Sequence, residues 1–67
     1  MDLATAHDLI GKTASLIIDG RRVDHVMVTG NQISTSGPSY IDLYLPTPIG
    51  ESDRRIRVRL DRVELAP

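Results

Sequence analysis

The sequence predicts an all-β protein built as one small domain behind a short helical lead-in. Three observations predict this fold class. Apolar residues recur with helical spacing as far as Gly11 and then alternate with polar residues, as in half-buried strands. Turn residues, such as the pair Asp19-Gly20, separate the alternating segments. The chain has 67 residues, which is enough for a single domain and no more.

The helical lead-in is expected over residues 1–11. Asp2 is suited to cap the first turn with its carboxylate, and Gly11 is suited to end the helix in a left-handed conformation. Four apolar residues share one face of this helix: Leu3, Ala6, Leu9 and Ile10.

A β-hairpin is expected next, with its turn at Asp19-Gly20. A type I′ turn requires positive φ at both central residues, and Asp-Gly satisfies that requirement. In the returning strand, Val23 is out of phase with Val26 and Val28. A β-bulge at Asp24-His25 restores the phase and bends the strand, so we expect one there.

Two further strands are expected over 40–45 and 54–60. The pair Gly30-Asn31 predicts a tight turn, and the segment ISTSGPS, residues 33–39, predicts a loop. The segment PTPIGESD, residues 46–53, is not expected to continue the strand, because its prolines lack backbone donors and Gly50 breaks the pattern.

The apolar phase slips once more at Asp61-Arg62, which predicts a single 3₁₀ turn before a short last strand at 63–66. Five short antiparallel strands, a bulged second strand and this break are typical of a small five-stranded SH3-like barrel. We therefore expect one domain over 1–67, with a helical lead-in at 1–11 and the barrel at 12–67. An OB-fold is the nearest alternative, but an OB-fold usually has a helix between its third and fourth strands, and this sequence shows none there.

The segment LIGKTASLIIDGRRVDHVMVTGN, residues 9–31, resembles the first half of an Sm-like domain: a helix end, a strand, an Asp-Gly-Arg-Arg turn and a bent strand. The glycine-containing nucleotide-pocket motif expected near the end of an Sm-like chain is absent. His25 stands about where a glycine would let the strand bend. We attribute the resemblance to shared small-barrel geometry, and such a widely used fold predicts no function by itself.

Composition narrows the class of protein. The net charge of −1 argues against a polycation that coats nucleic acid. The chain has no Phe or Trp to enlarge its core and no Cys to form a disulfide. Burial between subunits would compensate for this small core, so self-association into a homo-oligomer is expected. No stretch approaches the ~18 apolar residues of a membrane span, and the acidic N-terminus is unlike a secretory signal. We expect a cytoplasmic protein without membrane contact.

The main candidate site is a row of arginines in the segment RRIRVRL. If strands 40–45 and 54–60 pair, the polar side chains of both lie on one outer face, and these form the predicted partner-binding site: Tyr40, Asp42, Tyr44, Arg55, Arg57 and Arg59. Tyrosine and arginine are enriched at protein-binding hot spots. They also suit single-stranded nucleic acid, which stacks on rings and pairs with cations. The third interpretation is a solvated face in which Asp42 pairs with an arginine.

A second candidate site is an oligomer seam at Ile17 and Met27, which occupy the outer phase of the first hairpin and form an apolar spot if those strands pair.

The functional prediction is a small non-catalytic protein-interaction or oligomerisation module, such as an accessory or regulatory protein. The alternative is a nucleic-acid-binding small barrel that uses the Tyr and Arg side chains of the third and fourth strands. No catalytic residue, metal site or cofactor is predicted, because His7 and His25 stand on separate elements without ligand spacing. An enzyme site shared between several copies is the third and least supported hypothesis.

Overall fold

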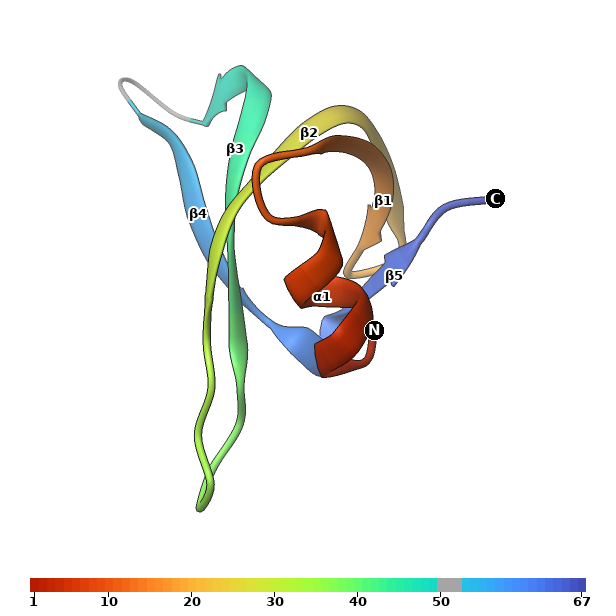
Figure 1. Ribbon diagram of the computed structural model, residues 1–67. Helices are drawn as coiled ribbons and strands as arrows, with labels where there is room; N and C mark the ends of the chain where they lie inside the picture. Colours follow the sequence, from red (N-terminus) through yellow and green to blue (C-terminus); the bar gives the residue numbers. More distant parts are fainter. Residues whose placement is uncertain (50–52) are drawn as a thin grey trace.

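The computed structural model describes residues 1–49 and 53–67 and shows a mostly β chain with one short helix (Figure 1). Its elements are, in chain order, α1 (Leu3–Leu9), β1 (Thr13–Ile18), β2 (Arg21–Gln32), β3 (Tyr40–Ile49), β4 (Asp53–Arg59), the 3₁₀ turn η1 (Leu60–Arg62) and β5 (Val63–Leu65). The described strands form one antiparallel sheet in the order β4-β3-β2-β1-β5. The all-β class, the short helix and the 3₁₀ turn before the last strand are confirmed.

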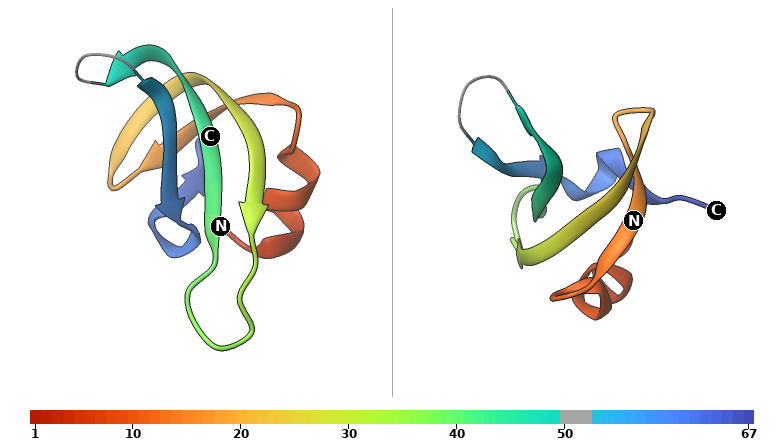
Figure 2. Two further views of the ribbon diagram at one scale, coloured as in Figure 1. Left: turned by 90° about the vertical axis from the view of Figure 1, so that its left-hand side faces the viewer. Right: turned by 90° about the horizontal axis from the view of Figure 1, so that it is seen from above.

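The sheet is strongly curved but not closed. Figure 2 shows β4, β3 and β2 side by side, with the β2–β3 hairpin projecting beyond the rest of the molecule. Within the described residues, β4 pairs only with β3 and β5 pairs only with β1. The two edges of the sheet therefore belong to β4 and β5, which are consecutive in the chain.

The helix α1 begins and ends as its sequence predicts. The side chain of Asp2 accepts a 2.8 Å hydrogen bond from the backbone N–H of Thr5, and this bond lowers the pKa of the Asp2 carboxyl. Gly11 follows the helix with φ of 82° and donates its N–H to the carbonyl of Val28 at 2.7 Å. Ala6 is fully buried, so α1 contributes to the core beside β2.

The first hairpin contains both expected features. Asp19 and Gly20 have φ of 50° and 81°, as a type I′ turn requires. Two residues of β2, Asp24 and His25, lie opposite the single residue Ser15, because Ala14 pairs with Val26 and Leu16 pairs with Val23. His25 takes a left-handed φ of 60° at this bulge. The bulge brings Val23 and Val26 to the same side of the sheet.

The tight turn expected at Gly30-Asn31 is wrong, because β2 continues to Gln32. Gly30 instead follows a second bulge, in which Thr29 has no partner of its own between the pairs Val28–Leu43 and Gly30–Asp42. A glycine in a strand is typical of a bulge as well as of a turn. The loop expected at 33–39 is present and joins β2 to β3.

The expectation that 46–53 cannot continue a strand is wrong for 46–49, because β3 runs through Pro46 and Pro48 to Ile49. The prolines are tolerated because the β3–β4 ladder jumps from Tyr44 to Ile49 and the β2–β3 pairs extend no further than Tyr44, so no described pairing needs a proline N–H. Gly50, which was expected to break the strand, lies outside the described residues.

The core consists of small and medium aliphatic side chains on the concave side of the sheet. Its buried members are Ala6, Leu16, Val26, Val28, Ile41, Leu43, Leu45, Leu60 and Val63. Ile56 and Val58 of β4 pack against this cluster but remain half-buried. The core is therefore well covered in the middle of the sheet and incompletely covered at the β4 edge.

Candidate nucleic-acid or protein interface

The register of β3 and β4 brings the predicted site residues together. Residues directly opposite each other in an antiparallel pair share a face of the sheet. Three such cross-strand pairs lie in succession: Tyr40 with Arg59, Asp42 with Arg57, and Tyr44 with Arg55. We call these six residues the Tyr/Arg face. The alternation in the two strands indicated which side chains face outward, and the structure adds that each tyrosine lies opposite an arginine.

Strand β2 extends the Tyr/Arg face by one more row. Met27 lies opposite Tyr44, Gly30 opposite Asp42, and Gln32 opposite Tyr40. Met27 and Tyr44 are 42% and 41% exposed, which makes them two of the more exposed large apolar or aromatic side chains in the described structure. An exposed Met–Tyr pair therefore adjoins the arginine row.

Carboxylates pair with Arg57 and Arg59 of the arginine row. Arg57 Nε donates to Asp42 Oδ1 at 2.8 Å, and this bond raises the pKa of the Arg57 guanidinium above its ordinary value. Asp42 is the less exposed partner, at 25% against 57% for Arg57. Asp42 therefore holds the middle arginine in place at the centre of the Tyr/Arg face.

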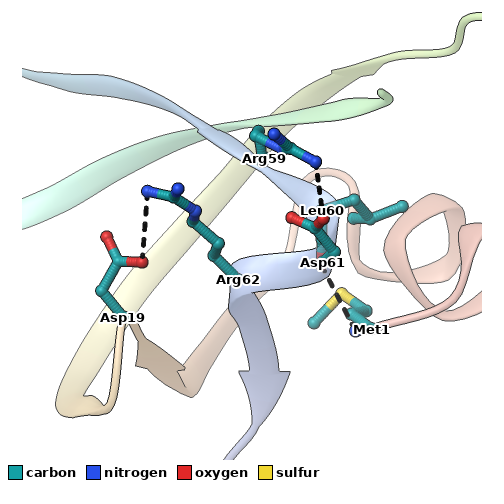
Figure 3. Close-up of polar contacts among 6 residues, drawn as sticks. All are labelled: Met1, Asp19, Arg59, Leu60, Asp61 and Arg62. Carbon is teal, nitrogen blue, oxygen red and sulfur yellow. Dashed lines mark hydrogen bonds and ion pairs between the residues drawn. The ribbon is translucent and has the colours of Figure 1, made fainter. Parts of the chain in front are cut away.

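The end of the arginine row is anchored at the 3₁₀ turn (Figure 3). Arg59 Nη2 donates to Asp61 Oδ2 at 2.8 Å, and Arg62 Nη1 lies 3.9 Å from Asp19 Oδ1. The amino group of Met1 donates to the carbonyls of Val63 at 2.7 Å and of Leu60 at 3.4 Å. These contacts tie η1 to the first hairpin and to the start of the chain.

An open pocket of about 420 Å³ lies beside the middle of the Tyr/Arg face. It is lined by Thr29, Asp42, Leu43, Arg55, Ile56 and Arg57. Thr29 reaches the pocket from the second bulge of β2, where its hydroxyl donates to the Asp42 carbonyl at 3.2 Å. Sequence reasoning missed Thr29, because the bulge that places it there was interpreted as a turn. The pocket therefore lies between the side chains of the arginine row and the backbone bulge of β2.

The proposed seam residues are not opposite each other. Met27 pairs with Thr13 and Tyr44, whereas Ile17 pairs with Arg22 and Glu64. Met27 is well exposed and Ile17 is half-buried. Met27 therefore belongs beside the Tyr/Arg face rather than beside Ile17, and a seam at these two residues remains a prediction.

Within residues 1–49 and 53–67, no group of three or more His, Cys, Asp or Glu side chains is placed to hold a metal ion. No helix in this part of the chain is long and apolar enough to cross a membrane. Comparison with known proteins found no matching family model, no similar curated protein and no similar solved structure. The proposals below therefore depend on the geometry of the Tyr/Arg face.

Proposed function

We propose that this protein is a small non-catalytic interaction module that binds an acidic segment of a partner protein through the Tyr/Arg face. The observation that carries the proposal is the register of β3 and β4, which aligns two tyrosines and three arginines around one aspartate. Tyrosine, arginine and methionine are the residues enriched at protein interfaces. Arg57 and Arg59 each donate to one carboxylate and keep further N–H groups, which favours a partner segment with acidic side chains.

The internal carboxylates favour a protein partner over nucleic acid. A protein binds the phosphate backbone of nucleic acid most strongly with a continuous positively charged surface. Here Asp42 stands between two arginine-bearing rows, and Asp61 engages Arg59. Each carboxylate repels a phosphate, whereas an arginine held by one carboxylate still has N–H groups for a second acceptor. A protein segment can place its acids where the arginines lie and avoid the aspartates.

Nucleic-acid binding is the second candidate, and one observation favours it. Tyr44 lies opposite Arg55 on adjacent strands, and Tyr44 is 41% exposed, so a base could stack on its ring while the arginine meets a phosphate. Arginines two apart on β4 are spaced at roughly 6.6–6.8 Å, close to the phosphate spacing of an extended single strand.

We also infer that the curved sheet is a partly open version of an SH3-like barrel. The strand order β4-β3-β2-β1-β5, the bent β2 and the 3₁₀ turn between β4 and β5 support this inference. In this interpretation the barrel remains open where no other described strand pairs with the outer edges of β4 and β5. Self-association at such an edge would make the protein an oligomerisation module.

The experiment is a selection of displayed random peptides on the immobilised protein, followed by titration of the selected peptides. We expect acidic sequences, and we expect Arg57→Glu to weaken their binding at least ~10-fold because an attractive contact becomes repulsive. Arg21→Glu is the matched control, because it makes the same charge change at the start of β2 beside the first hairpin turn, where Arg21 pairs with Ile18 of β1. Selected peptides that bind both variants equally well would refute the assignment to the Tyr/Arg face.

A parallel titration with labelled single-stranded and duplex oligonucleotides decides between the two candidates. Binding that weakens with salt by a log–log slope of roughly −0.7 to −0.9 per phosphate, and that Arg57→Glu abolishes, would replace the protein partner with nucleic acid. The mass of the protein in solution, measured over a range of concentrations, identifies self-association.

A further inference from the structure

Strand β4 has a free edge along its whole described length. It spans Asp53–Arg59, and within the described residues only β3 pairs with its backbone. In an antiparallel pair, every second residue directs its N–H and C=O away from its partner strand. The β4 edge therefore presents a row of backbone donors and acceptors to a further strand.

The two faces of β4 carry different side chains along this edge, and both kinds remain at least partly exposed. On the convex face, Arg55, Arg57 and Arg59 alternate along the strand. On the concave face, Ile56 and Val58 are half-buried, although their β3 partners are fully buried. The missing cover lies on the side away from β3. A neighbour on that side would thus meet cations on one face and aliphatic side chains on the other.

We propose that the β4 edge accepts an extended peptide as a sixth strand, and that the peptide alternates acidic and apolar residues. This inference rests on the proposed function and names the kind of partner and its mode of binding. Acids at every second position of an added strand recur at roughly 6.6–6.8 Å, which is the spacing of the arginines beside them. The intervening apolar residues face the other way and cover Ile56 and Val58.

The arginines also select against other occupants of this edge. Charged side chains on an edge strand discourage pairing with arbitrary strands. Two copies of this chain joined β4 to β4 would set arginines opposite arginines, which is unfavourable in a cross-strand pair. An acidic strand removes this repulsion. The edge is therefore selective for a strand of the opposite charge pattern.

The test uses the whole protein and two blocked peptides of equal composition. The first alternates as Glu-Val-Glu-Val-Glu-Val-Glu, and the second groups the same residues as Glu-Glu-Glu-Glu-Val-Val-Val. Affinity is measured by titration, and amide hydrogen exchange is followed for residues 54–59. We expect the alternating peptide to bind at least ~10-fold more tightly than the grouped one and to slow exchange at alternate β4 amides by at least ~10-fold.

Two controls separate strand addition from docking on the Tyr/Arg face. Methylation of alternate backbone nitrogens of the peptide, on the edge that meets β4, removes its donors, and we expect this to weaken binding at least ~10-fold. Methylation of the other set of nitrogens serves as the matched control. Arg57→Glu should weaken binding of the unmodified peptide, and Arg21→Glu should not.

Each of the following results would overturn the inference. Equal binding of the two peptides, or binding that leaves β4 exchange unchanged and tolerates both methylation patterns, would show docking on the Tyr/Arg face without strand addition, and the proposed function would stand. If the alternating peptide does not bind although library-selected acidic peptides do, strand addition is likewise refuted and the proposed function stands. Slow β4 exchange together with a larger mass in the absence of peptide would assign the edge to a second copy of this chain. Failure of every acidic peptide would refute the proposed function as well.

Discussion

Truncation of Leu43 to alanine tests how strongly the fold depends on the middle of the sheet. Leu43 is fully buried in β3 and lies between Val28 of β2 and Ile56 of β4. A buried Leu→Ala substitution costs about 2–5 kcal/mol, because the lost transfer free energy adds to that of the cavity left behind. At roughly 0.05–0.15 kcal/mol per residue, a chain of this length is stable by about 3–10 kcal/mol. Leu43→Ala should therefore remove a large share of the free energy of unfolding.

Leu65→Ala provides the control with the same chemical change. Leu65 is 52% exposed at the end of β5, so its truncation should cost less than about 1 kcal/mol. Urea unfolding followed by circular dichroism measures both variants, and their m-values should match that of the parent protein. Equal losses in the two variants, or a loss below about 1 kcal/mol for Leu43→Ala, would refute this account of the core.

Three further predictions concern single positions. Gly20→Ala should lower the free energy of unfolding by about 1–2 kcal/mol, because a φ of 81° is strained for alanine. No atom lies within contact distance of the added Cβ, so the loss, measured in a thermal melt, reports the backbone strain alone. His25→Gly should change that free energy little or raise it by up to about 1 kcal/mol, because glycine accepts a φ of 60° without strain; a loss above about 1 kcal/mol would show that the imidazole contributes contacts. The pKa of Asp2 is lowered in the folded protein, so its ionised carboxyl stabilises the fold above the unfolded pKa near 3.8, and this stabilisation is lost as pH falls through the lower folded pKa. Asp2→Asn keeps a hydrogen-bond acceptor but does not titrate, so its Tm should fall less steeply below about pH 4 than that of the parent protein.

The local pattern predicted the elements whose cause is local. The helix cap at Asp2, the turn at Asp19-Gly20 and the bulge at Asp24-His25 each depend on a few neighbouring residues, and all three are present. The alternation in β3 and β4 likewise predicted which side chains share the Tyr/Arg face. Period-two alternation fixes the face on which a side chain lies, independently of the partner strand.

The wrong predictions concern residues whose conformation depends on a distant strand. Gly30 permits either a turn or a bulge, and pairing with Asp42 of β3 decides between them. Pro46 and Pro48 end a strand only where a neighbour requires their N–H groups, and the ladder skips them. The pocket at Thr29 follows from the same bulge. Register across a loop is a tertiary property, so the residues on either side of the loop do not specify it.

The arrangement of the strands also bears on the order in which the fold assembles and opens. Strands β1 to β4 pair as successive neighbours along the chain, so each of these pairings closes a short loop. The pairing of β5 with β1 instead joins Ile18 to Val63 across most of the chain, which carries the largest entropy of loop closure. Strand β5 has three residues and ends at a half-exposed leucine. We expect β5 to dock last during folding and to detach first in local unfolding, which would uncover Leu16 of β1 before the rest of the core opens.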